Sequence, residues 1–250
     1  MLDEKKKQTI KLIIAVASLI LLFVFIIILM LKYEVEGERN MPFNLSKMVI
    51  ISTVEGNEIN ATHETKWNLD IVQNNDVYFY IDKNKEYDFK EDELIKSIKI
   101  ENISINKVPQ KGIIETYMPN STVSKIFSYD EQFIVGESLE YKGAKQSSIP
   151  NLEIGSQGGT VVIRFCNNNI GKYTSNDDEK IIHNSDLLKK IGVTNDDIMF
   201  GVSFDFIIET TKTKYKTTIK LDLPSVDLDV QENGYIEKED LTDIVFKREK

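Results

Sequence analysis

Residues 202–223, VSFDFIIETTKTKYKTTIKLDL, carry the clearest structural signal in the chain. Apolar side chains occupy every second position from Val202 to Ile208 and again from Tyr215 to Leu223, except for Thr217. Successive side chains of a β-strand point to opposite faces, so this period of two is typical of strands with one buried face. The short polar link TTKTK between the two runs predicts an antiparallel pair of strands.

This pair also predicts which side chains build the core. We expect four side chains to point between the layers of the domain: Phe204, Phe206, Ile219 and Leu221. Asp205 and Lys220 alternate with them and should point to the other side of the sheet.

Other segments repeat the strand pattern more briefly. Residues 67–71 and 77–81 both alternate, and the Asn74-Asn75-Asp76 sequence between them predicts a turn, so we expect a hairpin. Residues 161–165 predict one more strand.

Between Ile98 and Ile105 the apolar positions change phase, which a β-bulge near Glu101-Asn102 would explain. Helical signals are few. Residues 185–192 begin with a serine, carry two lysines in their last turn and end in a glycine, which predicts one short helix.

Many short strands with helices only as connectors predict a mainly β fold, an antiparallel β-sandwich. We expect this domain to cover residues 46–250, preceded by a stalk at 32–45. A segment rich in Gly, Ser and Pro at 143–159 is a candidate seam, so one large sandwich and two small ones both stay open.

Residues 12–31 predict a transmembrane helix that precedes the domain. They contain no charged residue, and twenty helical residues span about 30 Å, the thickness of the hydrocarbon core of a bilayer. A cleaved signal peptide has a shorter apolar run with a small-residue site after it. Four lysines lie in the tail 1–11, whereas acids predominate just after the helix, so we expect a cytoplasmic N-terminus and an extracellular C-terminal domain.

Charge and cysteine content exclude several classes of protein. The chain has a net charge of −9, and the tail contributes four lysines and two acids, so the part after the helix carries −11. An acidic domain without a basic patch is a poor binder of phosphate backbones, so we expect no nucleic-acid partner. The single cysteine excludes a disulfide within the chain, so the domain depends on its core for stability.

Two stretches resemble a known kind of protein. LKYEVEGERNMPFNLSKMVIISTVEG, which begins at the end of the apolar run, and the later IKSIKIENISINKVPQKG are similar to uncharacterised single-pass membrane proteins of Clostridium-like low-GC bacteria. The resemblance implies a bacterial plasma membrane and the same topology. It implies no activity, cofactor or catalytic residue.

One acidic stretch, DKNKEYDFKEDE, has the spacing of a calcium loop. The oxygen-bearing side chains at the liganding positions are Asp82, Asn84, Glu86, Asp88 and Glu93. Tyr87 stands where the sharp turn of such a loop needs glycine, and Lys90 occupies another liganding position. We therefore interpret this stretch as a solvated charged loop between strands.

The remaining chemically active residues are scattered. His63 and His183 lack a nearby partner for a triad or a metal site, so we interpret both as solvated loop residues. Cys166 alternates out of phase with Val161 and Phe165, which places it on the opposite face of their strand as a small packed residue. The sequence predicts no catalytic, cofactor-binding or metal-binding residue.

These observations favour a membrane-anchored, non-catalytic protein of the cell envelope whose β-domain binds or positions a partner. The expected partners are the lipid bilayer, through residues 12–31, and an envelope protein or cell-wall component. Two alternatives stay open: a subunit of a larger envelope complex, and a carboxylate-dependent envelope hydrolase with two acids converging in a cleft.

Overall fold

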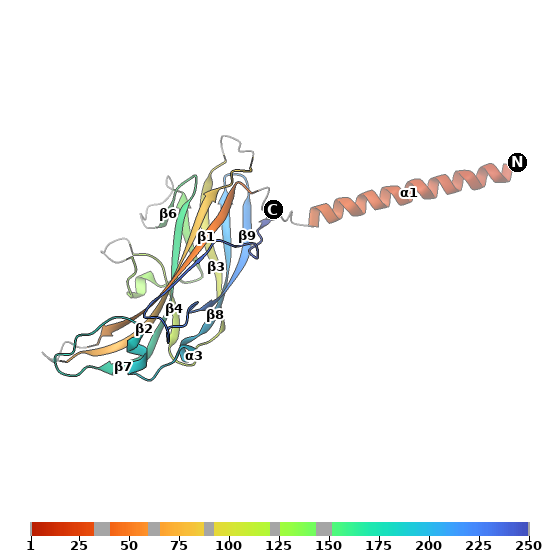
Figure 1. The fold of residues 1–250 in the computed structure, drawn as a ribbon. Coiled ribbons are helices and arrows are strands. Elements are labelled where there is room, and N and C mark those ends of the chain that lie inside the picture. Colours follow the sequence, from red (N-terminus) through yellow and green to blue (C-terminus); the bar gives the residue numbers. More distant parts are fainter. Residues whose placement is uncertain are drawn as a thin grey trace.

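The computed structural model describes residues 2–32, 41–59, 66–87, 93–120, 126–143 and 152–249. It consists of an N-terminal helix, α1 (Leu2–Lys32), followed by a mainly β domain of two sheets (Figure 1). The described side chains from Lys6 to Ile28 are not buried against the domain. The length and apolar composition of α1 suit a membrane anchor or a signal sequence, and the predicted segment 12–31 lies within it.

The first sheet has the order β10-β1-β2-β7-β4 and is antiparallel throughout. Its strands are β1 (Phe43–Glu58), β2 (Asn68–Lys83), β4 (Ile113–Tyr117), β7 (Gly159–Thr174) and β10 (Gly234–Lys238). Thus β1 begins within the predicted stalk.

The second sheet has the order β11-β9-β8-β3-β5-β6. Its strands are β3 (Ile95–Lys107), β5 (Ser138–Gly143), β6 (Glu153–Ile154), β8 (Phe200–Thr210), β9 (Lys214–Leu223) and β11 (Lys247–Glu249). All pairs are antiparallel except β5 with β6. The helical elements are α2 (Asp186–Lys190), α3 (Asn195–Ile198) and the 3-10 turn η2 (Glu131–Phe133).

The two sheets face each other as an open sandwich, which confirms the predicted fold class. The hairpin predicted at 202–223 is β8 and β9, with Phe204 paired to Ile219 and Val202 to Leu221. Phe204, Phe206, Ile219 and Leu221 are buried between the sheets, as the alternation predicts. The predicted bulge is also confirmed, because the register of β3 on β8 shifts between Glu101 and Ser104.

The hairpin predicted at 67–81 is wrong. Asn74, Asn75 and Asp76 do not turn the chain; they lie in the middle of the continuous sixteen-residue strand β2. The polar residues stay in the strand because β1 and β7 pair with β2 on both sides at these positions.

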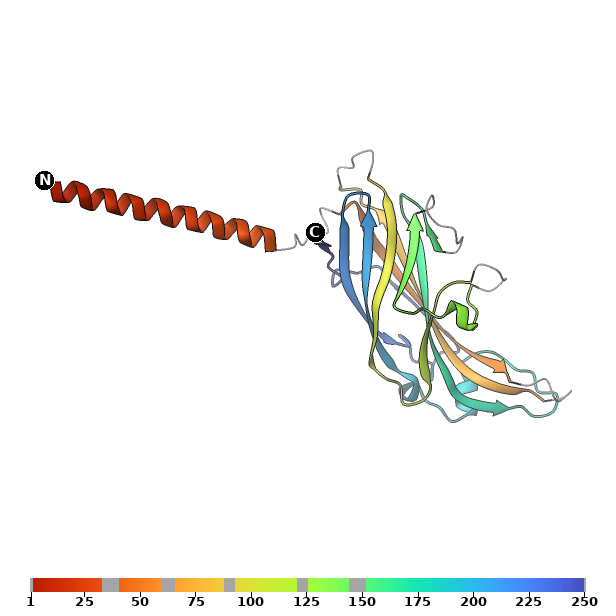
Figure 2. The ribbon, with the colours of Figure 1, turned by 180° about the vertical axis from the view of Figure 1, so that it is seen from behind.

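Two apolar clusters occupy opposite ends of the domain. The main core lies between the sheets and includes the contacting rings of Phe79, Phe165, Phe204 and Phe206. Strands β1, β2 and β7 continue past the second sheet (Figures 1 and 2). There they build the distal core, whose buried residues are Val54, Leu69, Ile71, Ile170, Leu187, Leu188, Val193, Ile198 and Leu228.

The strands on either side of the candidate seam at 143–159 join the same core. Leu139 and Tyr141 of β5 and Val161 and Ile163 of β7 all belong to the main core. Residues 144–151 lie outside the described part of the chain.

Candidate functional site

The acidic stretch considered as a calcium loop holds strand ends together instead. Asn84 is buried, and its Nδ2 donates a hydrogen bond to the carbonyl of Met41 at 2.9 Å. Glu93 is also buried and accepts a hydrogen bond from the hydroxyl of Tyr87 at 2.9 Å. The prediction of a solvated loop is therefore wrong for Asn84 and Glu93, whereas Asp88 lies outside the described residues. Within the described residues no three His, Cys, Asp or Glu side chains gather as metal ligands could.

The two isolated candidates have defined partners. Nδ1 of the exposed His183 accepts a hydrogen bond from the backbone N–H of Gly56 at 3.2 Å, so it is more than a solvated loop residue. Cys166 is fully buried on the face of β7 opposite the main core, as predicted, and its thiol donates to Asn168 Oδ1 at 2.9 Å. Burial raises the pKa of the Cys166 thiol, which disfavours the nucleophilic thiolate. His63 lies outside the described residues.

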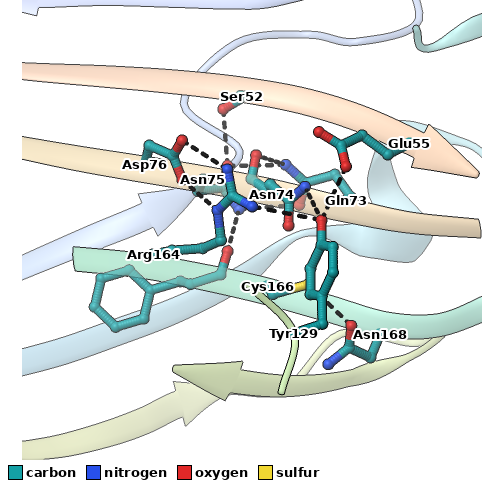
Figure 3. Close-up of polar contacts among 11 residues, drawn as sticks. Ser52, Glu55, Gln73, Asn74, Asn75, Asp76, Tyr129, Arg164, Cys166 and Asn168 are labelled. Carbon is teal, nitrogen blue, oxygen red and sulfur yellow. Dashed lines mark hydrogen bonds and ion pairs between the residues drawn. The ribbon is translucent and has the colours of Figure 1, made fainter. Parts of the chain in front are cut away.

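A polar cluster crosses the first sheet at the middle of β2 (Figure 3). On the inner face, Gln73 and Asn75 are fully buried and exchange two side-chain hydrogen bonds of 2.9 Å. Ser52 of β1 donates to Asn75 Oδ1 at 2.7 Å. Residues two apart on a strand share a face, so these side chains satisfy one another between the two apolar cores.

On the outer face, Arg164 of β7 lies opposite Asp76 of β2 and binds it through two hydrogen bonds. Nε donates to Oδ1 at 2.6 Å and Nη2 donates to Oδ2 at 2.9 Å. The guanidinium also lies 4.4 Å from the ring centroid of Phe127. The pair is therefore enclosed by the segment that precedes η2, and its bidentate geometry is the strong form of such a contact.

Tyr129 connects this ion pair to the neighbouring strands. Its hydroxyl accepts a hydrogen bond from Asn74 Nδ2 at 2.7 Å and donates one to Glu55 Oε2 at 3.1 Å. The same hydroxyl lies 3.4 Å from Arg164 Nη1. The segment of Phe127 and Tyr129 is thus tied to the outer face of the sheet by polar as well as apolar contacts.

Burial and ion pairing have opposite effects on the pKa values of Asp76 and Arg164. Burial raises the pKa of Asp76, and the hydrogen bonds from Arg164 oppose that rise. Burial tends to lower the pKa of Arg164, but Asp76 outweighs it and raises that pKa. A guanidinium stays protonated in proteins, so we treat the pair as ionised. Two carboxylates, Glu55 and Asp76, do act on each other here, but Glu55 is bound by the Tyr129 hydroxyl and Asp76 by Arg164.

A second feature is a pocket of ≈ 440 Å³ beside the distal core. Its lining residues are Gly56, Glu58, Trp67, Leu69, Glu179, Lys180, Ile181 and His183. Trp67, the only tryptophan of the chain, is 45% exposed and forms part of an apolar wall with Leu69 and Ile181. Charged side chains surround this wall, which is the usual arrangement of a binding pocket. We refer to it as the distal pocket.

The chain segment that forms one side of the distal pocket is held by specific contacts. Ser175 and Trp67 are joined by two hydrogen bonds, from Trp67 N to Ser175 Oγ at 2.8 Å and from Ser175 N to Trp67 O at 2.9 Å. Glu179 forms an ion pair with Lys190 of α2 and accepts a hydrogen bond from the Tyr173 hydroxyl at 2.8 Å. These contacts fix the position of residues 175–183 relative to β2 and α2.

Sequence reasoning missed both features, although one signal was present. The odd-numbered positions keep their phase from Ile71 to Val77, through Gln73 and Asn75, so an uninterrupted strand was readable across the polar residues. No comparable signal joins Trp67 to His183, because their proximity depends on the fold.

Comparison of the chain with family models, with curated proteins and with solved structures finds no match in any of the three.

Proposed function

We propose that this chain is a membrane-anchored, non-catalytic protein of the bacterial cell envelope that presents the distal pocket to a partner. In this proposal α1 crosses the plasma membrane with its N-terminus in the cytoplasm. The β-domain then lies outside the cell, and its function is to bind or position another envelope component.

The proposal is supported by the distance between anchor and pocket. The chain enters the domain at Phe43, the first residue of β1, and the pocket residues Gly56 and Glu58 lie at the other end of the same strand. Sixteen residues of strand extend about 50 Å. Strands β1, β2 and β7 would therefore hold the pocket far from the residue at which the chain leaves the helix (Figures 1 and 2).

The observation that carries the proposal is the exposure of Trp67. A large aromatic side chain that is 45% exposed beside a pocket leaves apolar surface in water, and a bound partner would cover it. Tryptophan is also enriched among the residues that dominate binding energy at interfaces.

The test is cross-linking in native membranes followed by isolation of the full-length chain. Trp67→Ala should abolish the capture of a component that the unchanged protein captures. Val108→Ala is the matched control, because Val108 is an exposed apolar residue of the loop after β3 and does not line the distal pocket. Equal loss with both variants, or no loss with Trp67→Ala, would contradict the proposal. If the component is still captured through contacts with α1 alone, the result would favour the alternative, in which the chain is a subunit held in a larger complex by its membrane helix.

The topology has its own test. Protease added to intact cells should digest the β-domain and leave a small membrane-embedded fragment that contains α1. Digestion should depend on access from outside, so inside-out vesicles should protect the domain. Protection of the whole chain in intact cells would exclude an external domain.

A further inference from the structure

The outer face of the second sheet carries a depression of ≈ 430 Å³ at the end of the domain where β8 turns into β9. Four lysines and two glutamates line it, together with one serine: Lys96, Lys99, Lys142, Lys214, Glu140, Glu209 and Ser97. The lysines come from three different strands, β3, β5 and β9, so the sheet itself brings them together.

Glu209 organises this group from its centre. Its carboxylate lies 2.6 Å from Lys96 Nζ and 3.7 Å from both Lys99 Nζ and Lys214 Nζ. The Glu209 side chain is 9% exposed, so one nearly buried carboxylate holds three ammonium groups in place. Such pre-positioned side chains lose less conformational freedom when they bind a ligand.

Positive charge remains in excess after these pairings. Glu140 lies 3.4 Å from Lys99, and no ion pair joins Lys142 to a described residue. Among the residues that line the depression, two carboxylates therefore face four ammonium groups, in a chain whose net charge is −9. Just outside it, Glu101 also acts on Lys99, and Glu153 lies beside Lys142 in the pairing of β5 with β6. Burial tends to lower the pKa of Lys99, but Glu140 and Glu209 outweigh it, so Lys99 stays a cation.

The depression lies at the end of the domain where the chain arrives from α1. The chain enters the domain at Phe43, which pairs with Lys83 at the end of β2. Tyr87, just after β2, donates a hydrogen bond to Glu93, and the turn between β8 and β9 bonds to the start of β3 through Thr211 N and the carbonyl of Leu94. Only nine peptide steps separate Lys32, the last residue of α1, from Met41, and this length of chain spans at most about 30 Å. If α1 is an anchor, lipid headgroups are within reach of this end of the domain.

We infer that this lysine depression binds the phosphate group of an organic phosphate, either in a phospholipid headgroup or in a soluble phosphate ester. A phosphate accepts hydrogen bonds from several ammonium groups at once and compensates their excess charge. The site is separate from the distal pocket and does not depend on it. The lipid source rests on the membrane anchorage in the proposed function, whereas the soluble source does not.

The test uses the full-length chain and compares two sources of phosphate. In the first arm the protein is held in uncharged detergent micelles and titrated with inorganic phosphate. In the second it is placed in nanodiscs of phosphatidylcholine, with or without phosphatidylglycerol. Acetylation of each lysine, followed by mass spectrometry, reports protection of Lys96 and Lys214 by the bound anion.

Lys142→Gln is the informative variant, because it removes one ammonium group and leaves the contacts of Glu209 intact. It should raise about fivefold the concentration of phosphate or anionic lipid that gives half-maximal protection. A fivefold change is equivalent to about 1 kcal/mol, the contribution of one lysine near an anionic surface. Lys220→Gln is the matched control, since Lys220 is exposed on the same face of β9 as Lys214 but lies farther along the strand and does not line the depression.

The outcomes separate the possible sources. Protection in both arms that Lys142→Gln weakens and Lys220→Gln does not would support a general phosphate site. The same result in the nanodisc arm alone would support a lipid headgroup. Absence of protection in both arms, or an equal effect of the two variants, would overturn the inference and leave only an undirected surface charge.

Discussion

The main core and the distal core use the same three strands in different ways. In the main core, β1, β2 and β7 are covered by the second sheet, and twenty-eight of the described residues are buried between the layers. In the distal core the same strands are covered, among the described residues, by α2, α3 and the segments of Ile181 and Leu228, and nine of the described residues are buried there. Local stability follows the number of buried apolar contacts, so the two ends of one sheet should differ in how easily they open.

This difference relates structure to the proposed roles of the two ends. A sheet that must hold a pocket far from its anchor needs long strands, and the sandwich fixes their near halves. The far halves are left with a smaller core, in which side chains can adjust around a bound partner. Binding regions are commonly drawn from the less stable parts of a fold.

The largest effect should come from Phe204→Ala in the main core. Phe204 is buried and its ring contacts Phe79 and Phe165, so its removal leaves a cavity and costs about 3–5 kcal/mol. Urea denaturation of the fragment 41–250 measures it, because every described residue of both cores lies within that fragment. Far-ultraviolet circular dichroism and Trp67 emission should shift together, since the distal core cannot persist without the sandwich.

Two further variants, measured in the same way, serve as comparisons for Phe204→Ala. Leu188→Ala in the distal core should cost less, about 2 kcal/mol, and should shift Trp67 emission before circular dichroism. Asp205→Ala should cost about 1 kcal/mol, because the half-buried carboxylate accepts hydrogen bonds from Asn102 and Thr218 and pairs with Lys216. Coincident transitions for Leu188→Ala would show that the two cores unfold as one unit.

The next largest effect should come from the ion pair at the boundary between the cores. Asp76→Ala leaves the guanidinium of Arg164 nearly buried without its partner, which should cost about 3 kcal/mol in the same urea assay. The double change of Asp76→Leu with Arg164→Met removes both charges and should recover much of that loss. If Asp76→Ala costs no more than the exposed control Asp130→Ala, the pair does not hold the outer segment in place.

The smallest effect concerns Glu179 beside the distal pocket. Its contacts with Lys190, the N–H of Asn176 and Tyr173 lower its pKa from 4.5 to about 2. A lowered carboxyl pKa stabilises the folded form above pH 4.5, and this stabilisation is lost as the pH falls toward 2. Glu179→Gln should therefore increase hydrogen exchange in α2 several-fold at neutral pH.

The pH dependence gives this prediction its check. Hydrogen exchange of the variant and of the unchanged protein should converge near pH 2, where Glu179 becomes protonated. Exchange in β8, within the main core, should be unaffected by the substitution at every pH. A difference that persists undiminished at pH 2 would mean that Glu179 acts through packing rather than through its charge.

Local patterns predicted those parts of the fold in which one face is apolar and the other polar. The alternation of β8 and β9 gave the correct antiparallel partner and the correct buried side chains. It failed at Asn74-Asn75-Asp76, because the propensity of these residues for turns is overridden by Ser52, Gln73 and Arg164, which satisfy them within the sheet. Ser52 and Arg164 are distant in the chain, so their hydrogen bonds to Asn75 and Asp76 cannot be predicted from a local window.

Short helices and the candidate site were harder to predict for the same reason. The helix expected at 185–192 is present as α2, but Ser185 donates to the carbonyl of Gln231 rather than capping the helix. Residues Asn195–Ile198 form α3, which begins with a capping box between Thr194 and Asp197. The distal pocket combines β1, β2 and the segment before α2, which only the folded chain brings together.

The pairing of β1 with β10 also constrains how the protein is made. Strand β1 has one edge covered by residues 234–238, which are synthesised after all of the strands from β2 to β9. If the domain is threaded through a membrane from its N-terminus, that edge stays unpaired until residues 234–238 have been exported. Over that interval Met48, Val49 and Ile50 present an apolar strand edge to neighbouring chains. The speed of export, or a chaperone at the outer surface of the membrane, would then decide how much of the newly made protein reaches its native state.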